Sequence, residues 1–121
     1  MSSVDPSVVK LYRRLERMVR KCGPVTVSPV KTSIGFKART TVAGVRFEKE
    51  GLRVGFLLAR RLENPRFVKV QSISPRNHEH VFRVREPKDL DSEVQSWLRE
   101  AYQVGQQLHL QQKRDAEPTT G

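Results

Sequence analysis

The chain has 121 residues, which is enough for one domain and too few for two. Hydrophobic residues make up 36% and charged residues 30%, a lean composition for a globular protein that still does not indicate disorder. The net charge is +10, and 19 of the 23 Lys and Arg residues lie before residue 86. A basic body of this kind favours an anionic partner, although net charge says nothing about the fold.

Cysteine usage and apolar runs indicate the compartment. Cys22 is the single cysteine, so no intrachain disulfide can form, which is typical of a reducing compartment. We interpret it as an inert, partly buried thiol. The first residues show no basic and apolar pattern of a secretory signal, and no apolar stretch is long enough to span a bilayer. We therefore expect a cytoplasmic protein without a membrane partner.

A first helix is expected directly after the N-terminal residues. Asp5 can cap the free N–H groups of a helix, and Pro6 is tolerated at the first helical position. Apolar residues then recur at three- and four-residue steps from Val8 to Cys22, which makes one apolar stripe. Gly23 and Pro24 follow, a pair that commonly ends a helix.

Between Val25 and Glu86 the apolar residues alternate with a period of two, which predicts strands. The expected strands lie at residues 25–27, 33–39, 42–48, 52–59, 67–73 and 80–85. In the third of these, alternation places Ala43 on the core face and Val42 on the opposite face. A tight hairpin turn is expected at Glu50-Gly51, and the short connections predict antiparallel neighbours.

A second helix completes the expected fold. Asp89 or Asp91 can cap it, and apolar residues from Leu90 to Leu108 form one side. The order of one helix, five or six strands and one helix predicts an α+β two-layer sandwich, with both terminal helices packed on one face of an antiparallel sheet. We expect a single domain over residues 1–110 and a flexible polar tail over 111–121.

Five segments resemble a known family. They are Leu11-Tyr-Arg-Arg-Leu15, Val25-Thr-Val-Ser-Pro-Val-Lys-Thr-Ser-Ile-Gly-Phe36, Val42-Ala-Gly-Val45, Leu52-Arg-Val-Gly-Phe56 and Asp89-Leu-Asp-Ser-Glu-Val-Gln-Ser-Trp-Leu-Arg-Glu-Ala-Tyr102. The pattern is similar to a small bacterial domain family of unknown function, found alone and at the ends of larger proteins labelled as predicted transport proteins. The resemblance spans residues 8–105 and implies a fold, without site residues. The element order is also similar to that of frataxin-like domains, by topology only.

The histidines do not form a recognisable catalytic or metal site. His78 and His80 flank Glu79 in a turn that enters the expected strand, where alternate residues share a face. Two imidazoles fall short of the three or four ligands that zinc requires. We interpret both as surface residues of a turn, and His109 lies near the expected tail. The sequence also shows no glycine-rich phosphate loop and no paired carboxylates. We therefore expect no enzyme activity, no metal and no cofactor.

A group of cationic residues shares the face of the first helix that lies opposite its apolar stripe. They are Lys10, Arg13, Arg14, Arg17, Arg20 and Lys21. Like charges at this spacing repel by roughly 0.2–0.5 kcal/mol per pair, and Glu16 is the single acid among them. This favours a surface that faces an anion. The alternative is an ordinary solvated helix face.

A second cationic group is expected on the polar face of the sheet. It consists of Lys37, Arg39, Arg46 and Arg53. By alternation these residues share a face with Gly35, Gly44 and Gly55, and glycines inside strands are expected where another molecule approaches the backbone. Such a floor with cations around it would accept a phosphate backbone or an acidic peptide. The alternative is that the glycines relieve twist or mark bulges.

The aromatic residues disfavour base stacking, because Phe36, Phe47 and Phe56 fall on the expected core face. We therefore expect a small basic module that binds a polyanion, namely a nucleic-acid backbone, without catalysis. One alternative is an accessory domain that meets an acidic protein partner. Another is a small-molecule binder or enzyme with a deep pocket. The sequence predicts neither the oligomeric state nor the order of the strands.

Overall fold

The computed structural model describes residues 5–29 and 33–116, the last ten of them as helix backbone alone. The strands are β1 (Thr26–Pro29), β2 (Ser33–Lys37), β3 (Thr41–Glu48), β4 (Gly51–Leu58), β5 (Phe67–Ser74) and β6 (Asn77–Val84). The helices are α1 (Pro6–Cys22), α2 (Ser92–Ala116) and the short 3-10 helix η1 (Pro87–Asp89).

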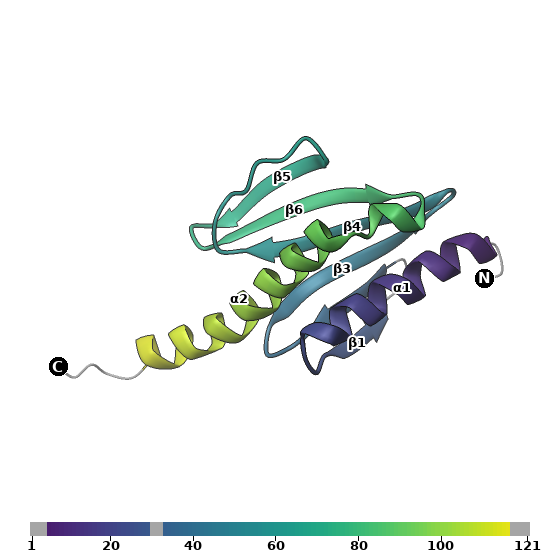
Figure 1. Ribbon diagram of the computed structural model, residues 1–121. Coiled ribbons are helices and arrows are strands. Elements are labelled where there is room, and N and C mark those ends of the chain that lie inside the picture. The colour runs from purple at the N-terminus through teal and green to yellow at the C-terminus, as the bar shows by residue number, and fades with distance from the viewer. Residues whose placement is uncertain (1–4, 30–32, 117–121) are drawn as a thin grey trace.

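The strands form one antiparallel sheet in the order β1-β2-β3-β4-β6-β5. Both long helices lie on the same side of this sheet, with α1 beside α2 (Figure 1). The predicted α+β architecture, an antiparallel sheet with terminal helices, is therefore confirmed. Among the described residues, no helix covers the opposite face of the sheet. None of the helices in the described part of the chain is long and apolar enough to cross a membrane.

Local capping fixes the ends of α1 as the sequence predicts. The Asp5 carboxylate accepts a hydrogen bond from the Ser7 backbone N–H at 2.9 Å, which satisfies one of the free donors of the first turn. Gly23 ends the helix with φ of +148°, a conformation that side chains rarely allow. The Tyr102 hydroxyl donates to the Pro24 carbonyl at 3.0 Å, so α2 holds the exit from α1 in place.

Helix α2 begins after Asp91, whose carboxylate accepts from the Val94 N–H at 3.1 Å. Of the two predicted caps, Asp91 therefore starts α2, whereas the Asp89 carboxylate accepts from the N–H groups of Arg85 and Glu86 beside η1. The helix continues to Ala116, past residue 111, where the polar tail was expected to begin. Residues 117–121 of that tail lie outside the described residues.

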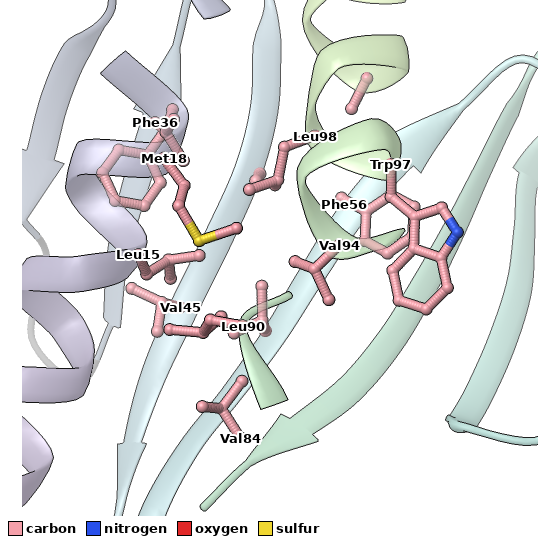
Figure 2. Close-up of a cluster of buried hydrophobic side chains, with 14 of the residues drawn as sticks. Leu15, Met18, Phe36, Val45, Phe56, Val84, Leu90, Val94, Trp97 and Leu98 are labelled. Carbon is pink, nitrogen blue, oxygen red and sulfur yellow. The ribbon is translucent and has the colours of Figure 1, made fainter. Parts of the chain in front are cut away.

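The core lies between the helices and the sheet. Leu15 and Met18 of α1 point toward Val94 and Leu98 of α2 above the sheet (Figure 2). Trp97 stacks on Phe56 of β4 with ring centroids 5.6 Å apart. Burial of each large apolar side chain stabilises the fold by roughly 1.5–3 kcal/mol. Together these contacts favour the packing of both helices on one face of the sheet.

One residue lies on the face opposite to the predicted one. The register of β2 and β3 shifts between Phe36 and Lys37, so that β3 has an additional residue, Val42. Alternation places Val42 away from the core, yet Val42 and Ala43 are both buried, and Val42 lies against Gly105 of α2. The prediction for Val42 is wrong because a bulge interrupts the alternation of a strand.

Both edges of the sheet are irregular or short. Strand β1 has four residues and ends in Pro29. Strand β5 pairs with β6, but its register shifts twice, between Phe67 and Lys69 and between Ser72 and Ser74. The skipped residues, Val68 and Ile73, are 50% and 59% exposed.

Candidate polyanion-binding surface

A row of glycines crosses the face of the sheet that carries no helix. Gly35 of β2, Gly44 of β3 and Gly55 of β4 lie directly opposite one another. Val81 of β6 and Lys69 of β5 continue the row toward the edge. Three adjacent strands therefore lack a side chain of their own at the same level.

Packing does not require two of these glycines. A Cβ atom at Gly35 would meet the Ser28 carbonyl oxygen at 3.8 Å, and one at Gly44 would meet the Ile34 carbonyl oxygen at 3.7 Å, both ordinary contacts. At Gly51 a Cβ would run into the backbone carbonyl of Val84, so that glycine is required by the fold. Gly35 and Gly44 instead leave space above the sheet.

A row of arginines lies next to the glycines. Arg46 of β3, Arg53 of β4 and Arg83 of β6 are directly opposite one another, on strands about 4.8 Å apart. Like charges in this position destabilise a sheet. Arg83 is 3.6 Å from the Glu48 carboxylate, whereas Arg46 and Arg53 form no ion pair with another described residue. A bound anion would relieve this repulsion.

These rows border a solvent-exposed hollow of about 320 Å³, here called the sheet hollow. It is lined by Ser33, Gly44, Val45, Arg46, Arg53, Gly55, Lys69, Glu79 and Val81. The predicted Arg46 and Arg53 are thus brought together. Lys69 and Glu79 escaped the sequence analysis, because strand alternation does not reveal that β6 lies between β4 and β5.

Two predicted residues of the same group lie elsewhere. Lys37 is at the end of β2, past the register shift, and Arg39 follows it in the bend before β3. Both are exposed and line a separate hollow beside Pro24 and Tyr102. The structure therefore does not bring Lys37 and Arg39 together with the sheet hollow.

The six cationic residues predicted on the first helix, here called the α1 stripe, are all exposed. Because α1 buries its apolar side on the sheet, the stripe lies on the side of the molecule that carries the helices, whereas the sheet hollow is on the other face of the sheet. Arg20 pairs with Glu16 at 2.8 Å, and Arg14 donates to the Leu90 carbonyl at 3.3 Å. The other four form no ion pair with another described residue.

Part of the α1 stripe borders a groove between the helices, here called the α1–α2 groove. Arg14, Arg17 and Lys21 line it together with the apolar Met18 and Leu90, and its volume is about 370 Å³. Its acidic member, Asp91, lies 3.2 Å from the guanidinium of Arg66, which comes from the loop before β5. The groove thus combines cations with a small apolar floor.

The prediction that His80 is a surface residue is wrong. Its side chain is fully buried, stacks on Phe56 at 5.2 Å and accepts a hydrogen bond at Nε2 from the Leu62 N–H at 2.9 Å. The cause is its position opposite Phe56, on the face that the helices cover. Burial lowers the pKa of His80, so its imidazole is held neutral.

The remaining potential ligands are dispersed. His78 is half-buried, with Ser72 Oγ 2.9 Å from Nδ1 and the Pro75 carbonyl 3.2 Å from Nε2. Burial raises the pKa of the half-buried Cys22 thiol, which keeps it protonated. Within the part of the chain that the structure describes, no three His, Cys, Asp or Glu residues gather as metal ligands. The side chain of His109 lies outside that part.

Comparison with protein-family models gives a match. A family model described as a domain of unknown function (DUF5655) matches residues 1–105. The match ends at Gly105, whose carbonyl accepts from the Thr40 hydroxyl at 3.1 Å and so ties α2 to the start of β3. No curated protein and no solved structure matches the chain.

Proposed function

The chain belongs to the DUF5655 family, a domain of unknown function, and we propose from its geometry that it binds nucleic acid through the phosphate backbone without catalysis. The observation that carries this proposal is the sheet hollow, where bare backbone lies between unpaired arginines and a lysine. Arg46 and Arg53 lie beside the glycine row, and Lys69 lies at its end on β5.

The chemistry of the hollow suits a phosphate group. A guanidinium donates two parallel hydrogen bonds to phosphate oxygens, and it loses little hydration when it does so. The absence of a side chain at Gly44 lets the ligand approach the strands closely. Each neutralised phosphate also releases condensed counterions, which makes the binding favourable at low salt and weak at high salt.

The position of the aromatic residues supports recognition of the backbone instead of the bases. Phe36, Phe56 and Phe82 are fully buried on the helix side of the sheet, and none of the residues lining the sheet hollow is aromatic. Stacking on aromatic side chains is the usual way in which single-strand binders hold bases. Binding in the hollow is therefore tolerant of sequence.

A salt series with matched variants tests this proposal. Random-sequence single-stranded RNA and duplex DNA are titrated with the protein at increasing salt. We expect Arg46→Gln/Arg53→Gln to weaken binding at low salt and to reduce the magnitude of the salt slope by about two. Arg13→Gln/Arg17→Gln removes the same charge from the α1 stripe and should leave the slope nearly unchanged.

Two outcomes contradict the proposal. If the unmodified protein binds neither nucleic acid even at low salt, the proposed function is wrong. If the α1 variant loses binding while the sheet variant keeps it, the surface is wrong and the α1 stripe takes its place.

The α1–α2 groove favours a second candidate function, an accessory domain that meets an acidic protein partner. Its apolar floor at Met18 and Leu90 beside Arg17 and Lys21 suits a peptide with both carboxylate and apolar side chains. A partner retained after nuclease treatment, and lost with Arg17→Gln/Lys21→Gln, would support it. Retention that depends on nuclease-sensitive material would contradict it.

We also propose a cytoplasmic location. Nucleic acid is abundant there, and the single Cys22 suits a reducing compartment.

A further inference from the structure

A carboxylate lies inside the otherwise cationic sheet hollow. Glu79 of β6 is opposite Leu57 of β4, and its side chain leans over Gly55. A Cβ atom on Gly55 would be 2.9 Å from the Glu79 Oε2 atom, so this oxygen rests on bare backbone at the floor of the hollow. Glu79 forms no hydrogen bond or ion pair with another described residue.

This position is unfavourable for a surface that binds phosphate alone. A carboxylate repels phosphate. Glu79 nevertheless shares the hollow with Arg53 and Lys69, two cations that are expected to attract the phosphate. An ionised carboxylate can only accept hydrogen bonds. Glu79 is therefore placed to accept from a ligand that carries a hydrogen-bond donor close to its phosphates.

RNA carries such a donor, and DNA lacks it. The ribose 2′-hydroxyl is a few covalent bonds from the backbone phosphate and is the group by which a protein tells RNA from DNA. Along β4, Arg53 and Gly55 are two residues apart, about 6.8 Å. Arg53 is thus placed to reach a phosphate while Glu79, above Gly55, meets the adjacent sugar.

We propose that the sheet hollow selects RNA over DNA, with Glu79 accepting a hydrogen bond from a ribose 2′-hydroxyl while Arg46 and Arg53 hold the neighbouring phosphates. This inference rests on the proposed function and specifies its ligand. Donors on base edges are a poorer match, since the bases point away from the backbone and no aromatic residue lines the hollow to hold one.

Three oligonucleotides of equal length test the contribution of the 2′-hydroxyl to binding. Oligo(U) RNA, oligo(dU) DNA and 2′-O-methyl oligo(U) are titrated with the full chain at low salt by fluorescence anisotropy. They share bases and phosphates, and the methylated strand keeps the 2′ oxygen but loses its proton. We expect oligo(U) RNA to bind about tenfold more tightly than oligo(dU), and the methylated strand to bind no better than oligo(dU).

A variant at Glu79 then assigns the preference. Glu79→Met keeps a chain of similar length and removes the acceptor, so the affinity ratio of RNA to DNA should fall to about one. Because repulsion is also lost, binding of oligo(dU) should become tighter. Glu63→Met is the matched control, since Glu63 is exposed in the loop after β4 and does not line the hollow. It should keep the preference for RNA.

The outcomes separate the two proposals. Equal binding of all three strands by the unmodified protein overturns the inference and leaves the proposed function standing. Binding of none overturns both. A Glu79→Met protein that still prefers RNA shows that another group reads the hydroxyl, which overturns the role of Glu79. The methylated strand tests the inference without any change to the protein.

Discussion

A substitution at Gly44 is expected to affect stability and binding of the proposed ligand differently. A Cβ atom there meets only ordinary contacts, and its neighbours across the strands are Gly35 and Gly55. Gly44→Val should therefore leave the melting temperature unchanged or raise it, because glycine inside a strand costs roughly 0.5–1 kcal/mol. The new side chain fills the floor of the sheet hollow, so RNA affinity should fall at least about tenfold.

Thermal melts and anisotropy titrations of the same preparation measure both effects. Gly51→Ala is the control, since its Cβ would enter the backbone of Val84 and should destabilise the fold by about 1–3 kcal/mol or more. A Gly44→Val protein that binds as before would show that the glycine row is not a contact surface.

The buried His80 makes stability depend on pH. Its folded pKa lies below the unfolded value of 6.5 because burial disfavours the imidazolium. As pH falls below about 6.5, the unfolded chain takes up a proton that the folded chain resists, so the free energy of unfolding decreases. Protonation at Nε2 would also break the hydrogen bond from the Leu62 N–H.

Urea unfolding at a series of pH values checks this prediction. Stability should decline between pH 7 and 5, and His80→Gln should flatten that decline. Asp5 and Glu100, whose pKa values are lowered by hydrogen bonds from Ser7 and Arg60, contribute to acid sensitivity only below about pH 4.5. A flat profile down to pH 5 would contradict a neutral, buried imidazole.

At the scale of elements, Arg66 fastens the loop before β5 to the start of α2. Its guanidinium lies 3.2 Å from the carboxylates of both Asp91 and Glu93, donates to the Asp89 carbonyl at 2.6 Å and sits 5.2 Å above the Trp97 ring. A lysine keeps the charge but cannot reproduce these directions. Arg66→Lys should lower the free energy of unfolding by about 1–2 kcal/mol.

Denaturant unfolding of Arg66→Lys measures that loss. Arg60→Lys serves as a comparison, because Arg60 contacts one carboxylate, Glu100, and its side chain is 58% exposed. Its cost should stay below about 1 kcal/mol. Equal losses in the two variants would show that the contacts of Arg66 with several groups add nothing.

The periodicity of apolar residues predicts the helices and strands well, but it does not predict which strands are adjacent in the sheet. The caps Asp5 and Gly23 and the apolar stripe of α1 lie in consecutive sequence, so the helix could be predicted from local chemistry. The strand order depends on long-range pairing that has no local signal. The sequence therefore could not predict that Glu79 and Lys69 line the sheet hollow, because β6 lies between β4 and β5 in the sheet. His80 was misassigned for a different reason: β6 begins at Asn77, so His80 lies inside a strand and shares its buried face with Phe82 and Val84.

At the scale of the whole molecule, the two cationic surfaces face opposite directions. An RNA strand in the sheet hollow leaves the α1 stripe open, so one molecule can contact a second strand through electrostatic attraction. Mixtures with long RNA should become turbid at low salt. Arg13→Gln/Arg17→Gln should reduce the turbidity while binding of a short oligonucleotide remains. Equal turbidity with this variant would show that the α1 stripe holds no second strand.

The two edges of the sheet determine how copies can meet. A straight strand with unpaired backbone groups is a template on which another chain can add, which is the route to fibres. Here one edge is four residues long and closes with Pro29, and the other is kinked twice, at Val68 and Ile73. Neither edge offers a regular row of unpaired backbone groups. Both edges therefore disfavour pairing of the sheet with that of another copy. On the proposed function, copies of the chain would come together by binding the same strand of nucleic acid.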